Sequence, residues 1–82
     1  MMTFNYSVTA IYDNCVSNLQ TNSADTAIRT MLTHAEAGAV VDVVNNYTGE
    51  VLATANHDEP YITEEWSLMI LGWLMQNGWV LE

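Results

Sequence analysis

The chain has no lysine and a single arginine, Arg29, but ten acidic residues, so its formal net charge is −9. Binding to nucleic acid or to an anionic membrane requires basic side chains that neutralise phosphate groups and release counterions. We therefore expect no direct contact with DNA, RNA or a membrane surface. An acidic protein can instead be steered onto a partner protein with a basic surface, including a nucleic-acid-binding groove. The alternative is that the acidic residues only keep an apolar chain in solution.

Cysteine and glycine are also scarce. The single cysteine, Cys15, cannot form an intramolecular disulfide, and its place in a strand pattern predicts a small buried side chain. Its surroundings in the sequence offer no base or cation to activate it as a nucleophile. The four glycines stand apart, so no glycine-rich loop is available for a phosphate group. His57, Asp58 and Glu59 are adjacent on an extended linker and would point in different directions, whereas metal ligands must converge. We predict no enzyme activity, no cofactor and no metal site.

A long hydrophobic run is missing as well. The apolar part of the C-terminal helix covers residues 66–75, which is well short of the roughly 20 residues that cross a bilayer. The first residues lack the charged and apolar regions of a signal peptide. Half of the 82 residues are hydrophobic, enough for a folded core. We expect one cytoplasmic domain over residues 1–82.

The sequence predicts two β-hairpins. Apolar and polar residues alternate over residues 3–12, and a turn at residues 13–14 would pair Val8 with Leu19 on a face that also holds Ala10. Residues 39–45 and 50–56 flank a loop that ends at a glycine and form the second hairpin. The expected inward residues of its strands are Val41, Val43, Val51, Ala53 and Ala55. The expected outward residues are Val40, Val44 and Leu52.

A helix is predicted between the hairpins. Asn22 or Ser23 caps it, and Asp25 in its first turn complements the helix dipole and can pair with Arg29 one turn later. Its apolar residues recur at i, i+3 and i+4 and form a continuous core stripe. They are Ala24, Ala27, Ile28, Met31, Leu32 and Ala35.

The C-terminal helix, TEEWSLMILGWLM over residues 63–75, is apolar almost all round. Its largest stripe, expected to face the core, is Trp66, Met69, Ile70, Trp73 and Leu74. Three large apolar residues, Leu68, Leu71 and Met75, then face outward and would be a liability on a small domain unless they are covered. We therefore predict a homodimer through these three residues. Gly72, costly inside a helix, would permit close approach of the second copy.

The order of elements is thus β-β-α-β-β-α. It predicts an α+β fold with one mainly antiparallel four-stranded sheet packed with two helices, although the strand order stays open. Four acidic residues surround the start of the second helix and are the candidate contacts for a basic partner. They are Asp58, Glu59, Glu64 and Glu65.

The stretch IRTMLTHAEAGAVVDVVNNYTGEVLATAN, residues 28–56, resembles short uncharacterised proteins carried by phages and mobile elements of gut bacteria. The helix that ends in AEAG and the strand pair around TGEVLA carry the resemblance. Such elements encode small acidic proteins that block host defences, anti-CRISPR proteins among them. The resemblance implies an inhibitor of this class and assigns no site residue.

Three hypotheses follow. The first is an acidic interaction module that inhibits a host nucleic-acid-binding defence protein by covering its basic surface. The second is a homodimeric assembly module without intrinsic activity. The third is a small-ligand-binding domain with an aromatic pocket of Tyr6, Tyr12 and Trp73.

Overall fold

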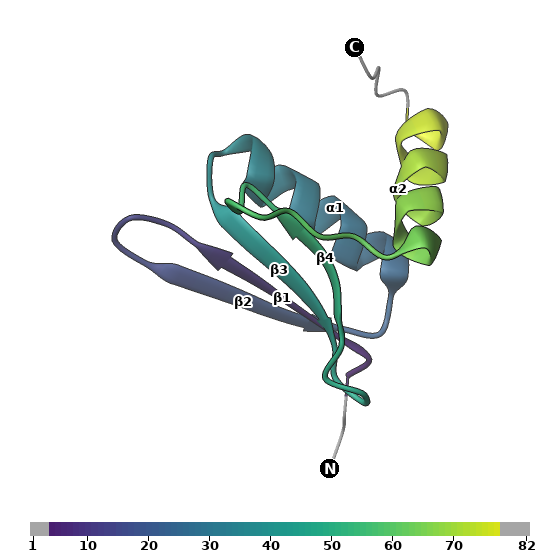
Figure 1. The fold of residues 1–82 in the computed structure, drawn as a ribbon, viewed down its shortest axis with the longest axis horizontal. Helices are drawn as coiled ribbons and strands as arrows, with labels where there is room; N and C mark the ends of the chain where they lie inside the picture. The colour runs from purple at the N-terminus through teal and green to yellow at the C-terminus, as the bar shows by residue number, and fades with distance from the viewer. Residues whose placement is uncertain (1–3, 78–82) are drawn as a thin grey trace.

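The computed structural model describes residues 4–77 of the chain, and its α+β fold has the predicted order β-β-α-β-β-α (Figure 1). The elements are β1 (Tyr6–Ile11), β2 (Val16–Thr21), α1 (Ala24–Glu36), β3 (Val40–Asn45), β4 (Val51–Ala55) and α2 (Glu64–Gln76). The four strands form one sheet in the order β2-β1-β3-β4, and every neighbouring pair is antiparallel. The two hairpins therefore lie side by side, and β1 and β3 are the central strands.

The first hairpin has the register that the sequence predicts. Val8 lies opposite Leu19, and the Tyr12 N–H donates to the Cys15 carbonyl at 2.8 Å to close the turn. On its other side β1 pairs with β3, where Val8 lies opposite Val43. β1 is therefore a central strand, and Val8 and Ala10 on its inner face are buried in the core.

Helix α1 covers one face of the two central strands. The Ser23 hydroxyl accepts from the Thr26 N–H at 3.1 Å and caps the helix, as predicted. Three residues of the predicted core stripe of α1 are buried, and they are Ala27, Ile28 and Met31. The core consists of Val8, Ala10, Ala27, Ile28, Met31, Ala39, Val41, Val43, Leu52, Ala53, Trp66, Trp73 and Leu74.

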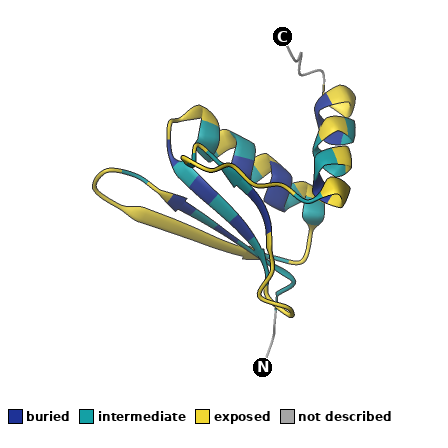
Figure 2. Ribbon diagram, in the orientation of Figure 1, coloured by how far each residue is buried: buried dark blue, intermediate teal, exposed yellow. Residues whose placement is uncertain are grey.

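Strand β2 extends beyond the cover that α1 provides (Figure 2). Leu19 is exposed although its side chain shares a face with buried Val8 and Ala10. Cys15, predicted to be buried, is exposed as well, because it lies at the hairpin end that projects past the helix. The burial prediction for Cys15 was therefore wrong: the alternation identified the face correctly, but it could not show how far the helix covers it.

A β-bulge corrects the predicted faces of β4. Val43 pairs with Ala53, but Val44 pairs with Val51, so Leu52 is the extra residue between two paired positions. Leu52 is 6% exposed and belongs to the core, whereas Val51 is exposed. The prediction had these two residues the other way round because strict alternation assumes an uninterrupted ladder.

Helix α2 begins after Thr63, whose hydroxyl accepts from the Trp66 N–H at 3.2 Å. It stands beside the start of α1, beyond the β4 side of the sheet, rather than lying across the outer sheet face (Figure 1). Trp66 packs edge-on against Tyr6, with ring centroids 5.4 Å apart, and this contact joins α2 to the first strand. The result is a sheet with both helices on one side and an open second face.

The open face near the first hairpin is polar, as the alternation predicts. The Asn18 amide donates to the hydroxyls of Ser7 and Thr9 at 3.0 and 2.9 Å. The Gln20 amide donates to Ser7 at 2.8 Å. Uncharged side chains thus satisfy one another across β1 and β2 without an apolar cover.

Candidate functional site

The linker between β4 and α2 is fixed to the fold at its first residue. Asn56 has a positive φ of 61°, a conformation that asparagine tolerates better than most residues. Its side-chain amide donates to the Ala35 carbonyl at 3.0 Å and to the Ala39 carbonyl at 2.8 Å. These bonds satisfy backbone groups at the end of α1 and hold the start of the linker against that helix.

The second half of the linker runs antiparallel along the outer edge of β4. The Thr54 N–H donates to the Tyr61 carbonyl at 2.8 Å, and the Thr63 N–H donates to the Leu52 carbonyl at 3.0 Å. An isolated bridge between Ala53 and Ile62 lies between them. This segment therefore covers the β4 edge and delivers the chain to α2 in a defined position.

His57 ties the middle of the linker to the sheet. Its Nε2 lies 2.6 Å from Oδ1 of Asp42, which is on β3, and both side chains are partly buried. Protonated His57 would form an ion pair with Asp42. His57 has the acidic neighbours Asp58 and Glu59 in the sequence. Its partner is 15 positions away, and only the folding of β3 beside the linker brings it close.

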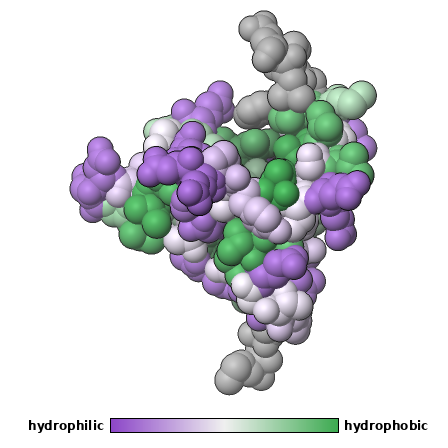
Figure 3. Space-filling view, in the orientation of Figure 1, coloured by the Kyte–Doolittle hydropathy of each residue, from purple (hydrophilic) through white to green (hydrophobic). Residues whose placement is uncertain are grey.

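The four predicted acidic contacts lie along the linker and the first turn of α2. Asp58 and Glu59 lie in a bend of the linker, Glu64 and Glu65 lie in the first turn of α2, and all four are exposed. Figure 3 shows strongly hydrophilic side chains at both ends of the linker, with apolar side chains between them. The structure thus places the acidic residues on one ordered strip, which we call the acidic strip (residues 58–65), rather than in one compact cluster.

The rest of the acidic residues extend the same charge over the surface. With the exception of partly buried Asp42, every aspartate and glutamate in residues 4–77 is exposed. Within this part of the chain, the one ion pair shorter than 4 Å is between His57 and Asp42. The predicted pair between Asp25 and Arg29 does not form, so Asp25 keeps an unpaired carboxylate.

The outward side of α2 is apolar and exposed, with the helical phase that the sequence predicts. Leu68 is 65% exposed, Leu71 is 42% exposed and Met75 is 77% exposed. We call these three residues the α2 outer patch. On the opposite side Trp66, Trp73 and Leu74 are buried, while Met69 and Ile70 are partly buried against the core.

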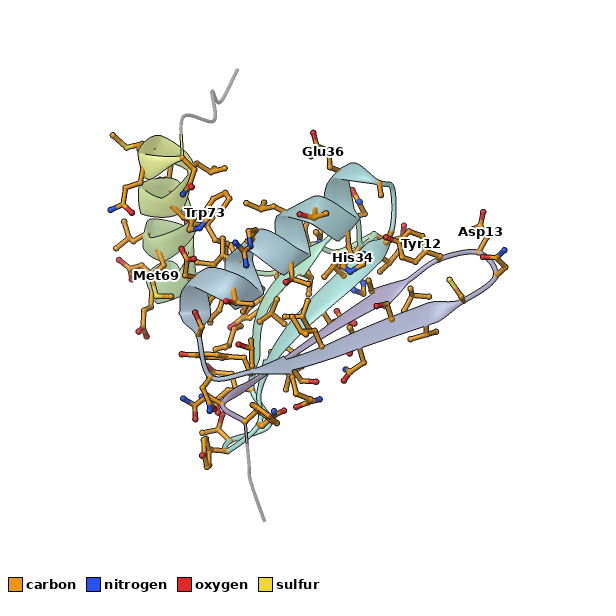
Figure 4. The ribbon with its side chains drawn as sticks, turned by 180° about the vertical axis from the view of Figure 1, so that it is seen from behind. Tyr12, Asp13, His34, Glu36, Met69 and Trp73 are labelled. Atoms are coloured by element: carbon orange, nitrogen blue, oxygen red, sulfur yellow. The ribbon has the colours of Figure 1, made fainter. Side chains whose placement is uncertain are left out.

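A third flank of α2 forms a groove with the start of α1. This α1–α2 groove has a volume of about 220 Å³ and is lined by Ala24, Asp25, Ile28, Met69, Gly72, Trp73 and Gln76. The four residues from α2 recur at i, i+3, i+4 and i+7, which is one side of a helix. In Figure 4, Trp73 extends from α2 toward α1 and forms one wall.

Packing against the described residues does not require glycine at position 72. A Cβ built on Gly72 meets no heavy atom within 4 Å, although glycine inside a helix costs about 1 kcal/mol relative to alanine. The close approach that would justify glycine therefore does not come from the described part of this chain. Its missing side chain leaves the groove open.

Within residues 4–77, the remaining titratable and aromatic side chains make local contacts. The Tyr12 hydroxyl lies 2.5 Å from Nδ1 of His34, and their rings meet edge-on. Tyr6 packs on Trp66 and Trp73 lines the groove, so the pocket of Tyr6, Tyr12 and Trp73 considered from the sequence is not assembled. Among residues 4–77, no three histidine, cysteine or acidic side chains come together as metal ligands would.

Sequence reasoning identified the acidic strip and the α2 outer patch but missed the groove. The groove depends on how α2 stands against the first turn of α1, and no periodicity encodes that placement. The mid-helix Gly72 is the available indication in the sequence, and it is also the residue predicted to permit a dimer contact.

Comparisons of the chain with protein-family models, with curated protein sequences and with solved structures find no match. In the part of the chain that the structure describes, no helix has the length and apolar character needed to cross a membrane.

Proposed function

We propose that this protein is a small acidic interaction module that binds a basic surface of a partner protein through the acidic strip. The observation that carries the proposal is the charge distribution: a net charge of −9 with one arginine, and acidic side chains exposed on an anchored segment. Preorganised charges lose less conformational entropy on binding than charges on a free loop. Long-range attraction between opposite charges also speeds the encounter.

The partner we propose is a nucleic-acid-binding defence protein of a bacterial host. Such a protein carries a basic groove for phosphate groups, and a surface without lysine can occupy that groove without repulsion. The resemblance of residues 28–56 to small acidic proteins of phages and mobile elements supports the same class of partner. By covering the groove, the protein would act as an inhibitor and would need no catalytic residue.

The test is capture of basic proteins from a lysate of the host by the immobilised chain at two salt concentrations. We expect a basic partner that is retained at about 50 mM salt and released at about 500 mM, because screening weakens attraction between exposed charges. The double variants Asp58→Asn/Glu59→Gln and Glu64→Gln/Glu65→Gln should each weaken retention. The control Asp13→Asn/Glu50→Gln removes the same charge away from the strip and should bind nearly as well. Equal weakening by all three variants, or retention that salt does not change, would contradict the proposal.

The second candidate function is self-association through the α2 outer patch. Leu68, Leu71 and Met75 form a continuous exposed apolar surface on one helix, and such surfaces on small proteins commonly mark contacts with other proteins. In that case the protein is a homodimeric assembly module, and each patch meets its own copy.

A further inference from the structure

The two edges of the sheet differ in how they are covered. The outer edge of β4 is paired with the chain's own linker, through the Tyr61 carbonyl and the Thr63 N–H. The other edge belongs to β2, and no strand in residues 4–77 pairs with its outer side. Every residue of β2 except partly buried Thr21 is exposed (Figure 2). We call this open side of the strand the β2 edge (residues 16–21).

The hydrogen-bond pattern of the first hairpin shows which backbone groups face the β2 edge. The Tyr12 N–H donates to the Cys15 carbonyl at 2.8 Å, and bonded and non-bonded pairs alternate along an antiparallel ladder. With the observed register, the backbone groups of Ser17, Leu19 and Thr21 face β1. The N–H and carbonyl groups of the residues between them therefore point away from the sheet. These residues are Val16, Asn18 and Gln20.

The β2 edge lacks the features that keep an open edge from pairing with other chains. Its sequence, VSNLQT, has no charged residue and no proline, and its six pairs with β1 follow one another without a bulge. Natural proteins protect edge strands with such features, because a row of unpaired backbone groups is a template for a further strand. An unprotected edge of this length indicates a surface for strand addition.

We propose that the β2 edge binds an extended, positively charged segment of the partner protein, which joins the sheet as an antiparallel fifth strand. An extended segment offers backbone donors and acceptors at the spacing of the strand that it joins. The net charge of −9 favours a segment flanked by lysine or arginine over a second copy of this chain, which is equally acidic. The inference rests on the proposed function, from which it takes the basic character of the partner.

The side chains of β2 indicate what the segment carries at alternate positions. Leu19 is 37% exposed on the face that carries α1, so an apolar residue opposite Leu19 gains a cross-strand contact. On the open face, the Gln20 amide donates to the Asn18 side-chain oxygen at 2.8 Å, and these two side chains suit polar neighbours. The segment that fits the β2 edge therefore alternates apolar and polar residues.

The binding experiment uses the full 82-residue chain, labelled with ¹⁵N, and two capped peptides at low salt. Both peptides carry the core Thr-Val-Thr-Val-Thr, flanked by two lysines at each end in one and by two glutamates at each end in the other. We expect the lysine peptide to shift the backbone amide signals of Val16, Asn18 and Gln20 most, with an affinity roughly tenfold above that of the glutamate peptide. Shifts centred elsewhere, or equal affinity of the two peptides, overturn the assignment.

Two N-methylated forms of the lysine peptide test the backbone pairing. In the proposed antiparallel strand, the threonine N–H groups face β2 and the valine N–H groups face solvent. Methylation of the threonine nitrogens should therefore lower the affinity roughly tenfold or more, because it removes donors to β2. Methylation of the valine nitrogens should leave binding nearly unchanged. Equal binding by the two forms contradicts strand addition.

A matched pair of variants tests the edge from the side of the protein. Asn18→Pro removes a backbone N–H that points away from β1, so the ladder between β1 and β2 keeps its hydrogen bonds while peptide binding should be lost. Asn18→Ala removes the same side chain but keeps the N–H, and it should bind nearly as well as the parent. Val16→Pro repeats the test at the first residue of β2, where proline is tolerated best. Unchanged binding by either proline variant, with circular dichroism showing an intact fold, overturns the proposal.

The outcomes separate this inference from the proposed function. If the lysine peptide does not bind but a basic partner is still captured through the acidic strip, only the strand addition fails. If the peptide binds the β2 edge but no salt-sensitive partner is captured, the proposed function fails and the edge remains a strand-binding site. Amide signals of β2 that move when the chain alone is diluted would show a second copy at this edge and overturn the assignment to a partner.

Discussion

At the scale of single residues, the core is small and each position in it matters. Its largest fully buried side chains are valines, Val8, Val41 and Val43, and alanines fill much of the remaining space between the sheet and α1. A domain of about 80 residues buries only roughly 60–65% of the surface of its unfolded chain. It therefore has little free energy of unfolding in reserve to tolerate a buried charge.

Ile28 provides the sharpest residue-scale prediction. Ile28 is 2% exposed on the sheet side of α1, so Ile28→Asp would bury a carboxylate without a partner. We expect the variant to be unfolded at 25 °C, with no cooperative thermal transition by circular dichroism. Thr33→Asp adds the same charge at an exposed position of α1 and should cost about 1 kcal/mol or less. A cooperative melt of Ile28→Asp within a few degrees of the parent would contradict the assigned burial.

At the scale of elements, the pattern of apolar residues predicted the strand register and the buried helix faces wherever the strands and helices are regular. The alternation around the first turn predicted the register of β1 and β2, and the 3.6-residue periodicity predicted the buried side of both helices. The patterns did not predict burial correctly where an extra residue interrupts a strand, or where the position of a neighbouring helix determines which residues are covered. The bulge at Leu52 reverses the faces within β4, and the position of α1 decides that Leu19 and Cys15 stay exposed. The same limit explains why the charges of the acidic strip were predictable and the groove was not.

The bulge gives an element-scale prediction. Leu52→Ala should lower the free energy of unfolding by about 2–5 kcal/mol, because it removes a buried side chain and leaves a cavity beside the core. Val51→Ala, one residue earlier on the exposed face, should cost about 1 kcal/mol or less. Urea unfolding of the two variants and the parent measures both differences. A larger loss of unfolding free energy for Val51→Ala than for Leu52→Ala would show that Val51 is the buried residue, and would contradict the bulge.

At the scale of the whole molecule, added salt should have opposite effects on binding through charged side chains and on self-association through apolar side chains. Two copies of a chain with net charge −9 repel each other, so self-association through the α2 outer patch should strengthen as salt screens that repulsion. Binding of a basic partner through the acidic strip should weaken over the same range. The sign of the salt effect therefore distinguishes the two candidate functions, even before the partner is known.

Leu71 tests the homodimer directly. Leu71 lies between Leu68 and Met75 on the α2 outer patch and is 42% exposed, so the monomer should tolerate Leu71→Glu. In a two-fold symmetric interface, the substitution would bury two like charges, and the dimer should dissociate. We expect light scattering at about 100 μM chain to show that the parent is a dimer favoured by salt, because this concentration populates complexes of micromolar Kd. The variant should be a monomer with unchanged circular dichroism.

Leu19→Glu makes the same substitution on exposed β2 and should remain dimeric. A monomeric parent at this concentration removes the homodimer, and a Leu19→Glu monomer would move the interface to the β2 edge.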